Sequence, residues 1–228
     1  MKVKNSLLGT MLLFTASSFA QESDVMFSSP KQIPQETQLL ELASKLISYG
    51  RQSKSALPLI QAVQILKQLN VVDDTLSANK EKSPFSEKGL LSDAAKYADG
   101  NKSLLALVKD AEKTSRAGWQ TGPIRHYSTI IPNGVDELKN WFQGGRLAQI
   151  VIDGQGEGIS ARDEEGNLLY SDLRLTVYDG RGRVIASDQT RGENCSVCFI
   201  PQKSCQLTIE VKNVGGLTDD YVLYIYNN

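Results

Sequence analysis

Hydrophobic residues recur at two different spacings along the chain, and the spacing changes near residue 120. Before that point they return every three or four residues, as in an amphipathic helix, and after it they alternate with polar residues, as in a half-buried strand. The pattern predicts an α+β fold, in which an N-terminal α-helical domain over residues 36–118 precedes a C-terminal antiparallel β-sandwich or jelly-roll over residues 119–228.

The helical part predicts about four helices that form two helical hairpins. Gly50 and Gly100 follow helical segments as natural stops, and Ser55 and Asn101 stand where a helix cap is expected. A polar stretch over residues 73–84 separates the second helix from the third, which begins near Ser86. The residues at helical spacing are Leu39, Leu42, Ala43, Leu46, Ile47, Ile60, Val63, Leu66, Leu69, Leu90, Leu91, Ala94, Leu104, Leu105, Val108 and Ala111. We expect them to form a core, and they identify no partner.

The second part reads as short strands separated by turn residues. A segment rich in Gly and Pro, residues 118–134, marks the domain boundary and contains a first strand near residues 124–131. In residues 173–178 the period of two places Leu173, Leu175 and Val177 on one face. Residues 179–182 can turn the chain into a hairpin. Further strands are expected at residues 147–152, 184–186, 196–200, 207–211 and 221–226.

Four of these segments together resemble a known family. They read Gly-Arg-Leu-Ala-Gln-Ile-Val-Ile-Asp-Gly (145–154), Leu-Arg-Leu-Thr-Val-Tyr-Asp-Gly-Arg-Gly-Arg-Val-Ile-Ala-Ser-Asp (173–188), Cys-Ser-Val-Cys-Phe-Ile-Pro (195–201) and Leu-Thr-Ile-Glu-Val-Lys-Asn (207–213). In order and spacing they are similar to the bacterial pre-peptidase C-terminal domain, a secreted sandwich module. Residues 157–171 resemble an insertion, and Arg174 stands where the family more often has an acidic residue. The resemblance implies an accessory module, in some members linked to polysaccharide or matrix-protein binding, and no binding residue carries over.

The first twenty residues predict a secretory signal peptide. A basic start, residues 1–4, precedes a short apolar run, residues 7–14, and Ser18-Phe19-Ala20 offers the small residues that a signal peptidase reads. The apolar run is shorter than the ~17–25 residues needed to span a bilayer. We therefore expect cleavage between Ala20 and Gln21, a flexible mature N-terminus over residues 21–35, and a periplasmic or secreted protein with no membrane span in the mature chain.

Charge excludes one class of partner. Without Lys2 and Lys4 the mature chain carries 23 basic and 26 acidic side chains, and neither half concentrates positive charge. Neutralising phosphates requires such a concentration, so nucleic acid is not expected as a partner.

The chain offers few groups for catalysis. His126 is its single histidine, and no Gly-x-Ser-x-Gly motif is present. A hydrolase would have to combine His126 with a carboxylate such as Asp136 or Glu137 in a cleft between the two halves. No spacing of paired carboxylates supports glycoside hydrolysis, so we expect a protein without a catalytic site.

A run of acidic residues begins just before the Gly154-Gln155-Gly156 segment of the sandwich. Asp153, Glu157 and residues 163–165 are closely spaced, with glycines between them, and such a run can wrap a calcium ion. The run lacks the alternating order of a tight calcium loop, and a solvated hairpin tip explains it as well. No cofactor is expected, with calcium as the alternative.

Three cysteines in an exported chain predict one disulfide and one free thiol. Cys198 and Cys205 enclose the shortest suitable loop, although strand parity points Cys198 away from the face of its apolar neighbours. Cys195 with Cys205 is the alternative pairing.

These observations favour an exported, non-enzymatic accessory or binding protein whose sandwich contacts a polysaccharide, an envelope component or another protein. Aromatic side chains could stack on sugar rings, and the candidates are Trp141, Tyr170, Tyr178, Tyr224 and Tyr226. The alternatives are a secreted hydrolase with a site in the interdomain cleft and a calcium-stabilised structural module.

Overall fold

The computed structural model describes residues 27–29, 35–73, 86–115, 122–154 and 161–227. The predicted signal peptide, including the cleavage site between Ala20 and Gln21, lies outside the described residues. In the described part the chain forms four helices followed by antiparallel sheets, and the predicted α+β class is confirmed. The helices are α1 (Gln35–Gln52), α2 (Ala56–Gln68), α3 (Glu87–Tyr97) and α4 (Lys102–Lys113).

Both predicted caps, Ser55 and Asn101, precede a helix, but only Asn101 makes capping hydrogen bonds, and Ser86 caps α3 in the same way. The Asn101 side chain accepts hydrogen bonds from the backbone N–H groups of Ser103 and Leu104, and Ser86 accepts one from Gly89. Ser55 precedes α2, but its side chain makes no capping hydrogen bond. Gly50 does not end α1, which continues to Gln52. A side chain at Gly50 would come within 2.8 Å of Leu59, so this glycine allows α1 and α2 to pack closely.

The strands form two main sheets and a small hairpin. The six-stranded sheet has the order β1 (Phe27–Ser28), β10 (Asn194–Pro201), β5 (Ala148–Gly154), β12 (Asp219–Asn227), β3 (Ile124–Ile130) and β2 (Val72–Asp73). The four-stranded sheet has the order β4 (Val135–Phe142), β11 (Cys205–Asn213), β8 (Leu173–Tyr178) and β9 (Val184–Asp188). The remaining strands, β6 (Ala161–Arg162) and β7 (Leu168–Leu169), pair with each other.

The two main sheets enclose the sandwich core. The predicted inward face of β8 is confirmed, since Leu173, Leu175 and Val177 are fully buried. They meet apolar residues of the six-stranded sheet, among which Ile150, Ile152, Val197, Phe199, Leu223 and Ile225 belong to the same cluster. Asp179 holds the predicted turn after β8, because its carboxylate accepts hydrogen bonds from the backbone N–H groups of Arg181 and Arg183.

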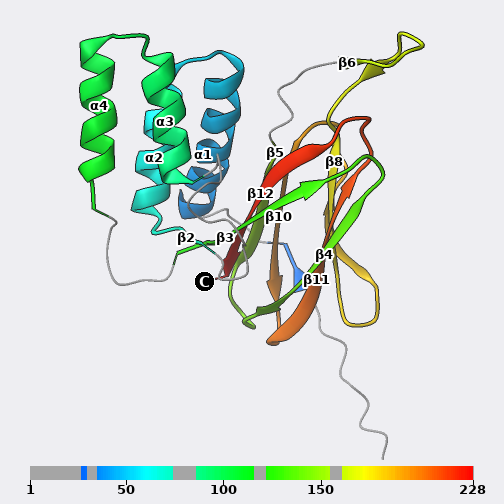
Figure 1. Cartoon of the computed structure of the whole chain (residues 1–228). Coiled ribbons are helices and arrows are strands. Elements are labelled where there is room, and N and C mark those ends of the chain that lie inside the picture. The colour runs from blue at the N-terminus through cyan, green and yellow to red at the C-terminus, as the bar shows by residue number, and fades with distance from the viewer. Residues whose placement is uncertain (1–26, 30–34, 74–85, 116–121, 155–160, 228) are drawn as a thin grey trace, which may run out of the picture.

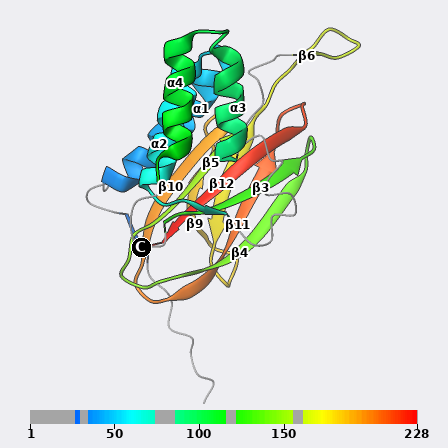
Figure 2. The same ribbon diagram turned by 60° about the vertical axis from the view of Figure 1, so that its left-hand side comes forward.

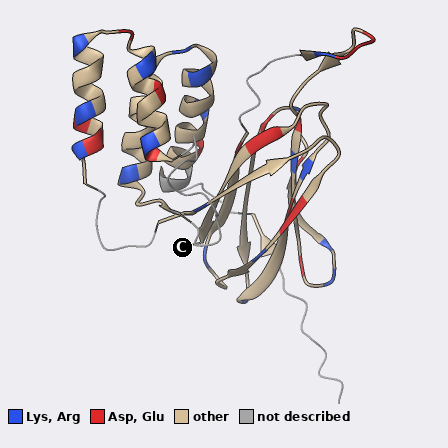
Figure 3. Ribbon diagram, in the orientation of Figure 1, with Lys and Arg blue, Asp and Glu red and all other residues tan. Residues whose placement is uncertain are grey.

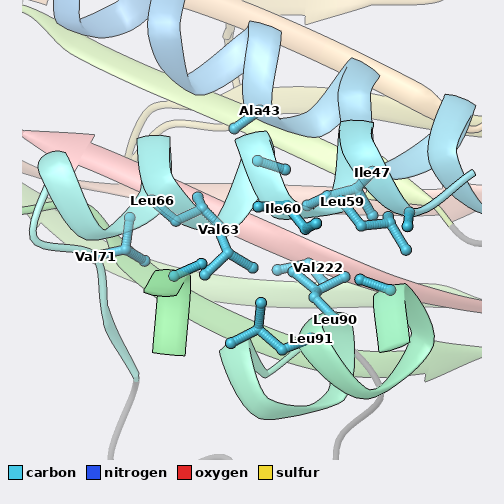
Figure 4. Packing of buried hydrophobic residues seen from close by; sticks show 14 of the residues in the cluster. Ala43, Ile47, Leu59, Ile60, Val63, Leu66, Val71, Leu90, Leu91 and Val222 are labelled. Carbon is cyan, nitrogen blue, oxygen red and sulfur yellow. The ribbon is translucent and has the colours of Figure 1, made fainter. Parts of the chain in front are cut away.

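The helices cover the other face of the six-stranded sheet (Figures 1 and 2). Val151 on β5 and Val222 and Tyr224 on β12 belong to the same buried cluster as the helical core. Figure 4 shows Val222 beside the packed side chains of α2 and α3. The molecule therefore has three layers, and β5 is buried along its whole length because both of its faces are covered. No helix in the described part is both long and apolar enough to cross a bilayer.

Five of the observed strands were not predicted: β4, β6, β7 and the two short strands at the edges of the six-stranded sheet, β1 and β2. Phe27 and Ser28, in the segment expected to be a flexible mature N-terminus, pair with β10, and the Phe27 ring packs edge-on against Phe199 with 6.3 Å between centroids. Val72 and Asp73 pair in parallel with the start of β3. The N-terminal half thus supplies both edges of the six-stranded sheet.

Candidate binding surface

The side of the four-stranded sheet that faces away from the core lies opposite the helices (Figure 1). We call it the outer face. Its members follow from strand register and alternation: Val135, Glu137, Lys139 and Trp141 on β4; Gln206, Thr208, Glu210 and Lys212 on β11; Arg174, Thr176 and Tyr178 on β8; Val184 and Ser187 on β9. None of the described helices packs against this face.

Trp141 is the most prominent side chain of the outer face. It is 61% exposed at the end of an edge strand, whereas large aromatic side chains usually bury most of their area. Gln206 lies directly opposite it on β11, and Lys139 precedes it on the same face of β4. An exposed indole surrounded by polar side chains is a feature that binding surfaces favour.

Tyr178 supplies a second ring on the same face. It lies opposite Thr208, and its hydroxyl donates a hydrogen bond of 3.1 Å to Glu210 Oε1. Burial, together with the hydrogen bond and negative charge of Glu210, raises the pKa of Tyr178 above its ordinary value. The phenol therefore stays protonated and fixed in orientation.

The register gives the separation of the two aromatic residues. Trp141 and Tyr178 lie two strands apart and are offset by two residues along the strands, so their Cα atoms are about 12 Å apart for ordinary strand spacings. Gln206 and Thr208 lie between them. Two rings with hydrogen-bonding side chains between them can stack on two sugar units of a chain and bond to their hydroxyls.

The other three predicted aromatic residues do not join this surface. Tyr224 is buried between the sheet and the helices, so it is not available for stacking. Tyr226 is half-buried near the end of β12. Tyr170 is 38% exposed near the β6–β7 hairpin, where the Arg191 guanidinium lies 4.0 Å from its ring centroid. Residue type alone could not distinguish the exposed tyrosines from the buried ones, because their environments depend on which strands become neighbours.

The residues considered for a hydrolase do not converge on an interdomain cleft. His126 pairs with Leu223, whose side chain faces the sandwich core, and so His126 lies on the face of β3 that is turned away from the helices. Asp136 accepts hydrogen bonds from Ser128 (2.7 Å) and Tyr221 (2.8 Å). Glu137, the next residue, belongs to the outer face on the opposite side of the same strand.

The acidic run is divided between two environments. Asp153 is fully buried against α1, whereas Asp163 lies at the tip of the β6–β7 hairpin, where its carboxylate accepts hydrogen bonds from Asn167. Acidic residues gather at this tip (Figure 3), and Glu157 lies outside the described residues. Within the described ranges no three His, Cys, Asp or Glu side chains are grouped to hold a metal ion. A calcium effect on stability stays a prediction, to be checked by melting in millimolar calcium.

The three cysteines are free thiols in the structure. Cys195 is buried in the sandwich core, and its Sγ contacts the Leu173 carbonyl oxygen at 3.3 Å. Cys198 belongs to the helix-facing side of β10, while Cys205 packs against the sandwich core. The pairing of Cys198 with Cys205 stays a prediction that mass mapping of the oxidised protein can check.

A group of carboxylates at the helix–sheet junction was not predicted. Asp153 Oδ1 accepts a 3.0 Å hydrogen bond from Ser48 on α1, and burial raises the pKa of Asp153 from 3.8 to about 7. Burial, followed by the negative charges of Asp153 and Asp219, raises the pKa of Glu193 to about 8. Nearby, the Glu41 carboxylate accepts hydrogen bonds from Gln149 and Ser196, and so links α1 to two strands.

A groove of about 400 Å³ lies among α2, α3 and α4. Its lining includes Lys67, whose ammonium group donates hydrogen bonds to the backbone carbonyls of Ala111, Glu112 and Thr114. These three hydrogen bonds hold the Lys67 ammonium group at the end of α4.

Comparisons with known proteins assign no family to the chain. No protein-family model and no curated protein matches the chain. Similar solved structures include the pre-peptidase C-terminal domain of a collagenase from Bacillus anthracis, with 12% identity over 44% of this chain and 86% of that chain and a TM-score of 0.32. PirA has 19% identity over 45% of this chain and 93% of its own, with a TM-score of 0.30. The Yersinia pseudotuberculosis-derived mitogen has 14% identity over 47% of this chain and 86% of its own, with a TM-score of 0.30. At these identities and TM-scores the three structures transfer no residue roles to this chain.

Proposed function

We propose that this chain is an exported, non-enzymatic accessory protein that binds a polysaccharide through the outer face of its four-stranded sheet. The observation that carries the proposal is the exposure of Trp141 on the same face as Tyr178, with Gln206 and Thr208 between them. The four described helices leave this face open because they cover the other sheet.

The chemistry of the face favours a sugar chain over an apolar partner. A sugar ring has an apolar face and a rim of hydroxyl groups, so it matches an aromatic platform bordered by amide and hydroxyl side chains. The remaining charges of the outer face are mixed, with Lys139, Lys212 and Arg174 against Glu137 and Glu210. A mixed face has no preference for strongly charged polymers, and the ligand class that fits is an uncharged polysaccharide.

Export and the family resemblance belong to the same proposal. The basic start and short apolar run of the leader support secretion, and the strand motifs support an accessory sandwich of the pre-peptidase C-terminal type. Fractionation of the producing cells and N-terminal sequencing of the purified protein check this part. A mature chain that begins at Gln21 in the periplasmic or secreted fraction is the expected result.

The binding proposal is tested with Trp141→Ala in affinity electrophoresis and calorimetry against a panel of uncharged polysaccharides. We expect a loss of affinity of about ten-fold or more, equivalent to about 1.4 kcal/mol, because the variant removes the larger stacking platform. Tyr49→Ala is a matched control, since Tyr49 is 60% exposed on α1, far from the outer face in the three-layer arrangement. It should bind as the unchanged protein does.

The outcomes separate the alternatives. Equal losses in Trp141→Ala and Tyr49→Ala would point to general destabilisation, which circular dichroism detects. Binding that survives Trp141→Ala and Tyr178→Ala together would overturn the outer face as the site. Failure of the folded, unchanged protein to bind any uncharged polysaccharide in the panel would overturn the proposed ligand class.

A further inference from the structure

The edge strand β4 presents unpaired backbone groups along one side. On its inner side it pairs with β11, where Asn140, Leu138 and Asp136 face Leu207, Ile209 and Val211. The other side of β4 has no neighbouring strand in the described sheets. At one end of this side the Asn227 side chain donates to the Trp141 carbonyl oxygen (2.9 Å) and accepts from the Gln143 N–H (3.2 Å). The N–H and C=O groups on this side therefore belong to the odd-numbered residues of β4, and among them the Trp141 carbonyl is already bonded to Asn227.

The odd-numbered side chains of β4 are complementary to themselves when the strand is reversed. Read forward they are Val135, Glu137, Lys139 and Trp141. Against a second, antiparallel copy centred on Leu138, Glu137 lies opposite Lys139 and Val135 lies opposite Trp141, and the reverse pairs follow by symmetry. Directly opposed apolar pairs and opposite charges are the combinations that stabilise neighbouring strands. The central Glu137–Lys139 pairs also point their backbone groups toward the other chain, as an antiparallel ladder requires, whereas at the end of the strand the Trp141 carbonyl would have to share its acceptor with Asn227.

The isolated chain leaves the charges of this strand unmatched. Glu137 lies directly opposite Glu210 on β11, and like charges in that position repel. Lys139 lies opposite Thr208, and neither Glu137 nor Lys139 forms an ion pair with the part of the chain that the structure describes. A lysine supplied by a second copy would offset the repulsion at Glu137.

We propose that the chain self-associates by antiparallel pairing of β4 with β4 of a second copy, about a two-fold axis at Leu138. The pairing joins two four-stranded sheets into one continuous sheet, an isologous arrangement in which one surface serves both partners. It follows from strand register and charge and is independent of the proposed function. If that function also holds, the two outer faces become one surface with two Trp141 platforms, and a polymer can engage both.

The contact is small, which sets the expected strength. One pair of eight-residue strands buries less than the ~1,200–2,000 Å² of stable complexes, so the dimer is expected to be weak and concentration-dependent. Sedimentation equilibrium of the purified chain between about 10 µM and about 1 mM covers the corresponding range of dissociation constants. We expect the apparent mass to rise from monomer toward dimer across this range.

Charge reversal at the edge tests the register. Glu137→Lys places two lysines opposite each other and Lys139→Glu places two glutamates opposite each other, so each variant alone should be monomeric at about 1 mM. An equimolar mixture of the two should associate, because each reversed charge then meets its opposite in the other chain. The double variant with both substitutions should associate as the unchanged chain does. Lys212→Glu, on the outer face but one strand inside the edge, is the matched control and should leave association unaltered.

Three results would overturn the proposal: an unchanged chain that stays monomeric at about 1 mM, single variants that associate like the unchanged chain, or a mixture of the two variants that stays monomeric. All the substituted side chains are exposed, and circular dichroism confirms that each variant is folded. Polysaccharide binding by a monomeric chain would leave the proposed function intact, so the two proposals fail separately.

Discussion

Asp153 is a carboxyl group whose neutral form is favoured by its burial in the fold. It is fully buried between β5 and α1, and its Oδ2 has no hydrogen-bond partner within the described residues. From α1 it is faced by Ser44, Ser48 and Arg51, and from the sheet its negative charge acts on Glu193 and Tyr224. An unpaired buried carboxylate is costly, and burial accordingly raises the pKa of Asp153 from 3.8 to about 7.

This shift predicts a stability that falls as the pH rises. A carboxyl whose pKa is higher in the folded state binds more protons when folded, so its contribution is complete below pH 3.8 and is lost as the pH approaches about 7. The raised pKa of Glu193 extends this loss of stability to about pH 8. Asp153→Asn keeps an oxygen for the Ser48 hydroxyl and removes the charge. We expect it to raise the free energy of unfolding by about 2–4 kcal/mol at pH 8 and to change it little at pH 4.

Urea unfolding of both proteins at intervals from pH 4 to pH 8 measures the effect. Asp163→Asn is the control, because Asp163 is an exposed aspartate at the hairpin tip whose pKa is lowered by its hydrogen bonds to Asn167. It titrates below this window and should leave the pH profile between 5 and 8 unchanged. Parallel profiles for the unchanged protein and Asp153→Asn would contradict the prediction.

At the scale of elements, Lys67 joins the end of α2 to the end of α4. Its buried ammonium group donates hydrogen bonds of 2.7, 3.0 and 2.8 Å to the carbonyls of Ala111, Glu112 and Thr114. The last carbonyls of a helix lack partners within the helix, and a cation there also complements the helix dipole.

Lys67→Met should therefore loosen α4. Methionine keeps much of the apolar stem but leaves these carbonyls without their donor, at a cost of about 2–3 kcal/mol in the free energy of unfolding. Hydrogen exchange of the amides in the last turn of α4 should accelerate, and the melting temperature should fall by about 5–10 °C. Lys96→Met on α3 is exposed and should change neither quantity measurably. Equal effects of the two substitutions would contradict the capping role.

The elements also show what a single sequence can predict. Long periodic segments such as α2 and β8 are recognisable because their buried residues keep one spacing. β4 was missed because its inward positions include Asp136 and Asn140, and the polar group of Asp136 is satisfied by Ser128 and Tyr221. β1 and β2 have two residues each, too few to show a period.

The candidate site was only partly predictable for the same reason. Trp141 and Tyr178 could be chosen by residue type, but their common face depends on β11 lying between β4 and β8. That order arises from pairing between segments distant in sequence, which local alternation does not encode. The sequence likewise placed Asp153 in an acidic loop, whereas the closing of α1 over β5 makes it a buried residue.

At the scale of the whole molecule, the helices and the sandwich share a buried cluster instead of meeting at a solvated boundary. Val151, Val222 and Tyr224 of the sheet pack with the helical core, and the N-terminal half supplies β1 and β2 to the six-stranded sheet. When two parts share a core and a sheet, the unfolding of one exposes apolar surface that it had buried on the other. We therefore expect one cooperative unfolding transition.

Val222→Ala at the shared layer and Val177→Ala in the sandwich core test this coupling, since both side chains are fully buried. Each removes two buried methyl groups, so each should lower the melting temperature by about 5 °C. In both variants the helices should melt at the same temperature as the sheet. Far-ultraviolet circular dichroism follows the helices, and calorimetry and tryptophan fluorescence follow the sheet. If Val177→Ala left the helical signal at its original temperature while the sandwich melted earlier, the two halves would be independent domains.

Coincident transitions would instead mean that a ligand on the outer face stabilises the helices as well, because binding to the folded state stabilises every part that unfolds with it.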